Sequence, residues 1–112
     1  MSNTLVIDGK QLALDKEGYL KNLNDWSPDI AERLATLEEI ILKPEHWEVI
    51  ELLRDFYQQR ELSPSMRILV KLMNTEYGPV KGTSLYLLSL FPGSPAKISS
   101  KIAGLPRPTN CL

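Results

Sequence analysis

The sequence has a single cysteine, Cys111, and a single histidine, His46, among its 112 residues. One thiol per chain excludes an intramolecular disulfide and any mechanism that cycles between dithiol and disulfide. The two residues are also too few for a structural zinc site, which takes several such ligands. We therefore expect no metal and no cofactor. We expect His46, beside Trp47 near the start of a predicted helix, to have a structural role.

Long hydrophobic runs are also missing. No apolar stretch approaches the roughly 20 residues that span a bilayer. Residues 1–4 show no basic segment followed by an apolar one, as a secretory signal would. We therefore expect a cytoplasmic protein without a membrane segment. The length and the hydrophobic content of 43% suit one domain with its own core.

Negative charge is absent from the end of the sequence, since no acidic residue follows Glu76. Residues 1–62 carry 13 acidic and 7 basic side chains, whereas residues 63–112 carry 6 basic side chains against Glu76 alone. Such an asymmetry indicates that the second half meets something negative. Two complementary surfaces that pack within a dimer would explain it equally well.

Turn and cap residues predict a mainly α domain with an N-terminal hairpin. Asp8–Gly9 lies between short apolar runs, a strong signal for a tight β-turn. Helical spacing of apolar residues, with proline near the helix starts, predicts about five helices. Their expected ranges are 27–40, 43–60, 63–77, 84–90 and 94–101.

Three of these helices carry further expectations. In the first, one apolar stripe should face the core, made of Ile30, Leu34, Leu37 and Ile41. The fourth, residues 84–90, is apolar enough to be a buried central element. In the third, Ser63–Pro64 should provide the cap and the first helical proline. Together, residues 1–102 should form the helical body.

Residues 103–112 read as a mobile C-terminal arm that carries Cys111. Pro106 and Pro108 favour an extended chain, which would span roughly 30 Å over ten residues. Lys101 and Arg107 favour the Cys111 thiolate, and the terminal carboxylate opposes them. A mobile arm has no rigid base or oxyanion site for hydrolysis, but it suits delivery of a group from one partner to another. The alternative is an ordinary surface cysteine.

The remaining candidates are basic. Arg67 and Lys71 share one helix face, and with Lys81 they could form an anion-binding patch or simply a solvated face. The helix pair 43–60 and 63–77 is like a helix-turn-helix. Few basic residues and a net charge of −1 argue against direct DNA binding, since phosphate contacts supply most of the affinity. The aromatic residues fit core positions, and we assign them no chemistry.

Taken together, these stretches resemble the DsrC/TusE family of sulfur-relay proteins. The resemblance covers essentially the whole chain in order, and its most specific part is the tail from Ile102 to Leu112. The other matching stretches are Asp8–Gly9, Asp15–Leu20, Pro44–Trp47, Leu53–Tyr57, Ser63–Arg67 and Lys81–Gly82 before Tyr86.

The resemblance implies that Cys111 accepts sulfur as a persulfide. Some members have a second arm cysteine at the position of Ser100, and its absence implies the TusE-like branch. Such a protein would be a sulfurtransferase component rather than a stand-alone enzyme. It would take sulfur from a donor resembling the TusBCD complex and pass it to a tRNA-thiolating enzyme resembling MnmA, for 2-thiouridine at the tRNA wobble position. The alternative is a DsrC-like, non-catalytic regulator or binding module of a sulfur-metabolism complex.

Overall fold

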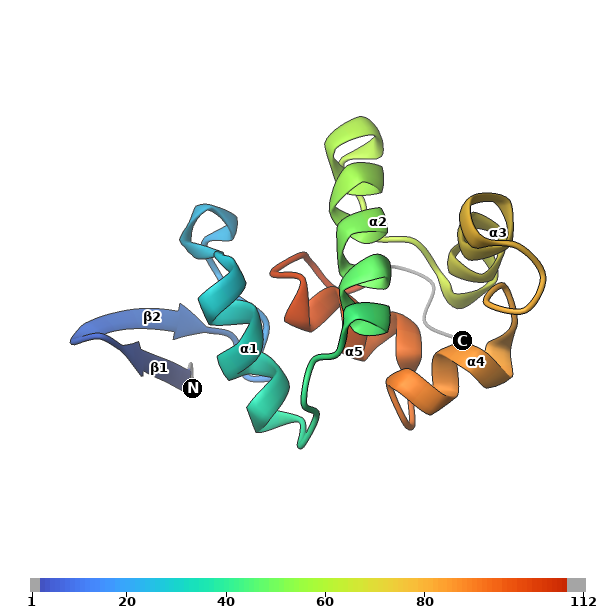
Figure 1. Cartoon of the computed structure of the whole chain (residues 1–112). Helices are drawn as coiled ribbons and strands as arrows, with labels where there is room; N and C mark the ends of the chain where they lie inside the picture. Colours follow the sequence, from blue (N-terminus) through green and yellow to red (C-terminus); the bar gives the residue numbers. More distant parts are fainter. Residues whose placement is uncertain (1–2, 109–112) are drawn as a thin grey trace.

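The N-terminal hairpin forms as the Asp-Gly signal predicts. A computed structural model describes residues 3–108. Strand β1 (Asn3–Ile7) pairs antiparallel with β2 (Lys10–Leu14), so that Leu5 lies opposite Leu12. Asp8 (φ 52°) and Gly9 (φ 77°) both take the left-handed conformation that a tight two-residue turn requires. Leu12 and Leu14 are buried, which anchors the hairpin to the helices beside it (Figure 1).

A short 3-10 helix, η1 (Leu23–Asp25), leads into α1 (Pro28–Leu37). The Ser27 hydroxyl accepts the Ile30 N–H at 3.4 Å and caps the helix start. The predicted apolar stripe is wrong in its second half, because Leu37 is 59% exposed and Ile41 is 85% exposed. The helix ends at Leu37 and the chain turns at Glu39 (φ 60°), so Ile41 lies beyond the helix.

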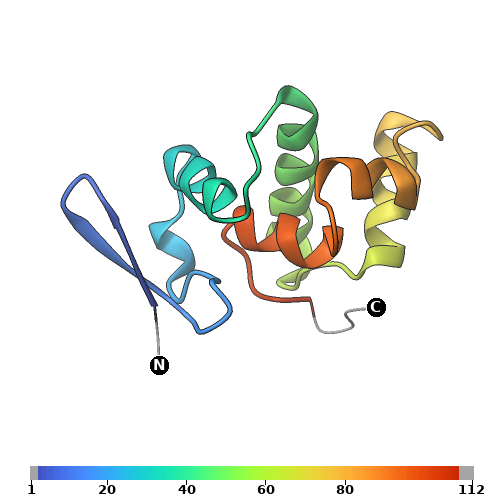
Figure 2. The ribbon, with the colours of Figure 1, turned by 90° about the horizontal axis from the view of Figure 1, so that it is seen from below.

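The other four helices form as the sequence predicts, except that the third helix of the chain begins at Met66, so Pro64 lies before the helix and not in its first turn. They are α2 (Pro44–Arg60), α3 (Met66–Tyr77), α4 (Ser84–Leu90) and α5 (Pro95–Ile102). Helix α5 lies at the centre and contacts α1, α2, α3 and α4 (Figure 2). The core is one cluster to which the hairpin and all five α-helices contribute buried side chains.

Two details of the helical region differ from expectation. Helix α4 is peripheral rather than central, since only Leu87 is buried and Leu85 is 80% exposed. The apolar composition of α4 was misleading because α5, with its small buried serines, occupies the centre instead. Ser65, not Ser63, caps α3 through the Ile68 N–H.

The connection between α3 and α4 depends on a glycine. A Cβ built on Gly82 would lie 2.4 Å from the Asn74 Cα, so the loop can approach the last turn of α3 only without a side chain. This contact explains in physical terms why residue 82 is a glycine. None of the helices in the described chain is long and apolar enough to cross a membrane.

Replacing Gly82 with alanine tests this contact. We expect Gly82→Ala to lower the free energy of unfolding by about 2 kcal/mol, because the helix backbone must move to admit the methyl group. Thr75→Ala, an exposed change one residue after Asn74, is the control and should be close to neutral. Urea titration measures both. Equal stability of the two variants would contradict the account of this loop.

Candidate functional site

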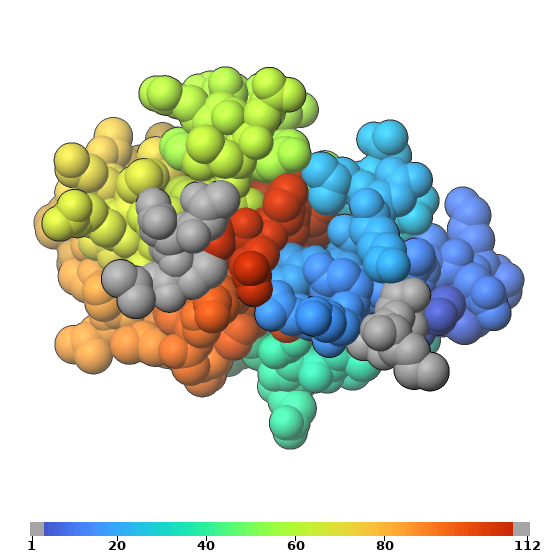
Figure 3. All heavy atoms as spheres, turned by 180° about the vertical axis from the view of Figure 1, so that it is seen from behind, coloured from blue at the N-terminus to red at the C-terminus, as the bar shows by residue number. Residues whose placement is uncertain are grey.

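The predicted arm is described only as far as Pro108, and Cys111 lies outside the described residues. The part that is described lies against the body. Ala103 and Leu105 are buried in the core cluster, and Pro108 is also buried. Residues 103–108 therefore continue the core rather than leave it at residue 103. Figure 3 shows this red segment between the blue N-terminal region and the yellow-green α2–α3 region. Mobility of residues 103–112 stays a prediction.

Trp26 holds the first turn of this segment. Its indole Nε1–H donates to the Ile102 carbonyl oxygen at 2.9 Å. The ring packs so closely on Gly104 (φ 73°) that a Cβ there would lie 2.2 Å from the Trp26 Cδ1. Only glycine combines a left-handed backbone with this close approach. The chain direction after α5 is thus fixed by one indole ring.

Arg54 contacts both the indole ring and the segment that follows α5. Its guanidinium carbon lies 3.8 Å from the centroid of the Trp26 ring, and Nη1 donates to the Ala103 carbonyl oxygen at 2.6 Å. Stacking and a charge-assisted hydrogen bond from one planar group restrict that group strongly. Burial lowers the pKa of Arg54 through desolvation, but the group stays protonated at neutral pH.

Ser63 holds the segment further along. Its hydroxyl donates to the Pro106 carbonyl oxygen, which explains why Ser63 is buried and does not cap α3. Trp26, Arg54 and Ser63 thus donate hydrogen bonds to the carbonyl groups of residues 102, 103 and 106, respectively. We call these three residues, with Gly104, the arm clamp. Beside it, Trp26, Arg54 and Leu105 line an open depression of about 380 Å³.

The predicted basic residues do not form one patch. Lys81 pairs with Glu48 of α2 at 2.8 Å, and this hydrogen bond raises the Lys81 pKa. Lys101 pairs with Glu38 at the end of α1 at 3.0 Å.

The other three predicted basic residues are Arg107, which is paired, and Arg67 and Lys71, which have no such pair among the described residues. Arg107 Nη1 contacts both carboxylate oxygens of Glu17 at 3.0 Å. Arg67 and Lys71 are exposed on α3, and no carboxylate among residues 3–108 pairs with either. Three of the five cations are therefore paired with carboxylates of this chain.

His46 has the structural role expected of it. Its Nδ1 accepts the Lys43 N–H at 3.0 Å, and its Nε2–H donates to the Leu90 carbonyl oxygen at 2.9 Å. The ring is buried and packs edge-on against Phe91. The Nδ1 contact thus caps the start of α2, and the Nε2 contact joins α2 to α4. Within residues 3–108, no cluster of three histidine, cysteine or carboxylate side chains could hold a metal ion.

Two adjacent serines of α5 differ in their partners. Ser99 and Ser100 are both fully buried. The Ser99 hydroxyl donates to the Pro95 carbonyl oxygen, whereas the Ser100 hydroxyl has no partner among the described residues. An unpaired buried hydroxyl costs free energy. The position at which some relatives would carry a second thiol is therefore a poor place for a hydroxyl.

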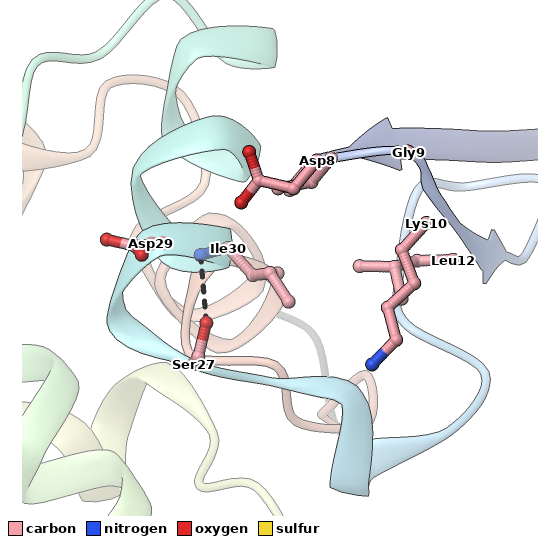
Figure 4. Close-up of a pocket in the computed structure, with 8 residues that line it drawn as sticks. Asp8, Gly9, Lys10, Leu12, Ser27, Asp29 and Ile30 are labelled. Atoms are coloured by element: carbon pink, nitrogen blue, oxygen red, sulfur yellow. Dashed lines mark hydrogen bonds between the residues drawn. The ribbon is translucent and has the colours of Figure 1, made fainter.

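A second depression lies away from the C-terminal segment. It has a volume of about 350 Å³ and lies between the hairpin turn and the start of α1 (Figure 4). The side chains of Leu12 and Ile30 point toward each other across it, with Asp8 and Lys10 at its rim. None of the predicted site residues lines it.

The sequence did not reveal the arm clamp. By its spacing Trp26 fits a core position, Arg54 is only part of a matching stretch, and Gly104 lies within residues 103–112, which the sequence predicts to be mobile. The available signal was the glycine between two apolar residues directly after a helix, which is typical of a left-handed helix end. That signal locates Gly104 but not the ring that covers it.

We expect Gly104→Ala to lower the free energy of unfolding by about 3 kcal/mol, from the clash with the indole and the left-handed backbone. In a Trp26→Ala background the same change should cost about 1 kcal/mol, because only the backbone term remains. Chemical denaturation of the four proteins gives the coupling. Additive effects would contradict the close approach of Trp26 to Gly104.

The two buried serines provide a matched pair. Ser100→Ala should raise the free energy of unfolding by about 1 kcal/mol, because it removes an unpaired hydroxyl. Ser99→Ala should lower the free energy of unfolding by about 1 kcal/mol, because it removes a satisfied hydrogen bond. Thermal and urea unfolding measure both. Destabilisation of similar size by the two variants would show that the Ser100 hydroxyl has a partner.

The sequence matches known proteins over almost its whole length. The family model described as DsrC like protein matches residues 6–112. Sulfurtransferase TusE of Escherichia coli strain K12 is 49% identical over 108 residues, which cover 96% of this chain and 99% of that protein. Sulfurtransferase TusE of Photorhabdus laumondii is 50% identical and covers 96% of this chain and 97% of its own.

Solved structures give the same result for the fold. The NMR structure of Allochromatium vinosum DsrC superposes with a TM-score of 0.90 at 46% identity and covers all of both chains. The oxidized gamma-subunit of the dissimilatory sulfite reductase (DsrC) from Archaeoglobus fulgidus has a TM-score of 0.87 at 38% identity, over 98% of this chain and 100% of its own. The chain therefore belongs to the DsrC-like protein family.

Proposed function

We propose that this protein is a cytoplasmic sulfur carrier that holds a persulfide on Cys111 and serves 2-thiouridine formation at the tRNA wobble position. The observation that supports this most strongly is the match, at 49% identity over 96% of the chain, to proteins named sulfurtransferase TusE. The sulfur donor would be a complex resembling TusBCD. The acceptor would be a tRNA-thiolating enzyme resembling MnmA, with tRNA as the final substrate.

The chemistry needs one thiol on this chain. The Cys111 thiolate attacks the outer sulfur of the donor persulfide, a new S–S bond forms, and the donor cysteine leaves as a thiolate with the electron pair of the broken bond. In the next step the acceptor thiolate attacks the outer sulfur on Cys111, and Cys111 leaves as a thiolate. Neither step changes the total number of electrons, so no external oxidant or reductant takes part.

The lone thiol gives the carrier its selectivity. A second cysteine on the same chain would attack the inner sulfur and release the cargo while forming a disulfide. Ser100, at the place where some relatives carry that cysteine, cannot do so. The carried sulfur therefore leaves only to a thiol of another molecule.

The arm clamp contributes by fixing the position of residues 102–106, from which the chain continues to Cys111. We call residues 109–112 the carrier end. Cys111 is the third residue after Pro108, which allows a chain length of at most about 10 Å between them. Cys111 is the sixth residue after Leu105, which allows a chain length of at most about 20 Å between these two residues. A short tether raises the local concentration of the thiol at a docked partner. The titratable side chains that line the depression beside the clamp are Glu51, Arg54, Asp55 and Tyr57. Further acid–base groups for the exchange would come from the partner.

A second candidate function is supported by the solved structures. The Archaeoglobus fulgidus relative is a subunit of a dissimilatory sulfite reductase. This chain could bind such a complex as a non-catalytic regulator, with its C-terminal segment as the docking peptide. In that case Cys111→Ser would bind the complex as well as the wild type does and would support its activity equally.

The carrier proposal is tested by the mass of the protein after exposure to a cysteine desulfurase and the upstream relay proteins. We expect the reduced protein to gain the mass of one sulfur atom on Cys111, and the gain to disappear on treatment with a thiol reductant. Cys111→Ser should gain nothing. Lack of any sulfur on Cys111, under conditions in which the upstream carriers are charged, contradicts the proposal.

A further inference from the structure

The corner between α2 and α3 lies next to the place where the described chain ends. Ser63, in this corner, binds the Pro106 carbonyl, and both Pro64 and Pro108 are buried. Four residues follow Pro108 in the sequence, and Cys111 is the third of them. With a tether of at most about 10 Å, a protein that exchanges sulfur with Cys111 must come close to this corner. The inference rests on the carrier function proposed above.

The corner has the composition of a protein interface. Residues 60–71 carry three basic side chains, Arg60, Arg67 and Lys71, against one acidic side chain, Glu61. Between the cations, Leu62 is 44% exposed and Ile68 is 39% exposed. Exposed aliphatic residues bordered by arginine are typical of surfaces that bury against another protein.

The charges of the corner are available to a partner. In the second half of the chain, Lys81, Lys101 and Arg107 are paired with carboxylates of the first half. Arg67 and Lys71 have no such pair within residues 3–108, and they lie one turn apart on α3. The positive excess noted in the sequence is therefore reduced at three places. Of the three cations of residues 63–108 that have no ion pair within the described chain, Arg67, Lys71 and Lys97, two lie at this corner.

We propose that the α2–α3 corner, formed by Arg60, Leu62, Arg67, Ile68 and Lys71, is the surface on which sulfur donor and acceptor proteins dock through an acidic face. A protein fits better than a nucleic acid, because two exposed aliphatic side chains lie among only three cations. Nucleic-acid affinity depends on many phosphate contacts. Because both partners need the same short tether, they should compete for the corner.

The test compares two double charge reversals. Arg67→Glu with Lys71→Glu alters the corner. Lys10→Glu with Lys21→Glu alters exposed cations of the hairpin and the segment after it, and it changes the net charge by the same amount. Binding of the purified donor complex and of the purified thiolating enzyme, each in its reduced form, is measured by titration calorimetry at two salt concentrations. Circular dichroism of both variants confirms that they are folded.

We expect the corner variant to bind both proteins roughly tenfold more weakly or worse, with wild-type affinity falling as salt rises. The control variant should stay within about twofold of the wild type. Donor and acceptor should displace each other. Sulfur loading of Cys111 by inorganic polysulfide should be the same in all three proteins, since it needs no docking.

Two results would overturn the docking inference and leave the carrier function intact. One is that both variants lose the same affinity, or that neither loses any, while Cys111 still accepts sulfur from its donor. The other is a corner variant that binds both proteins normally but no longer retains tRNA. Failure of the wild type to accept sulfur from any donor would instead overturn the carrier function, and the docking inference with it.

Discussion

The approach of the Trp26 ring to Gly104 is the contact on which the rest of this structure depends. It turns the chain at the end of α5 and places the carbonyl groups of residues 102 and 103 against Trp26 and Arg54. From there the segment reaches Ser63, and the described chain ends beside the start of α3. Without this contact, Leu105 and Pro108 would lose their places in the core. The segment between the helical body and the carrier end would then no longer be held in one position on the body.

Charge is used in two ways in this protein. The acidic first half supplies Glu17, Glu38 and Glu48, each of which holds one cation of the basic second half. These partly exposed pairs add specificity to the packing more than stability, since exposed pairs contribute about 0–1 kcal/mol. Of the cations of the second half without such a pair in the described part of the chain, Arg67 and Lys71 lie on α3, which begins close to Ser63 and its contact with Pro106. A partner with an acidic face would therefore be guided to the part of the surface that Cys111 can reach.

Local rules predicted the elements, and their failures have physical causes. Asp8–Gly9 predicted the hairpin and Pro44 the start of α2, because such signals act through neighbouring residues. The burial of α4 was predicted wrongly, because composition does not say which helix lies centrally. The arm clamp joins residues 26, 54, 63 and 104, and such a contact has no local pattern. Cys111 is a candidate because of its position in the sequence, and its role stays a prediction because it lies outside the residues that the structure describes.

The most direct measurement of the central claim follows labelled sulfur from charged Cys111 to tRNA in a single turnover with the thiolating enzyme. Wild type and Gly104→Ala are compared at a temperature at which both are folded and equally loaded with sulfur. If the clamp directs the carrier end, the variant should transfer its sulfur roughly tenfold more slowly or worse, because the thiol is misplaced at the partner. Equal transfer rates, or label that reaches tRNA without Cys111, would contradict the account.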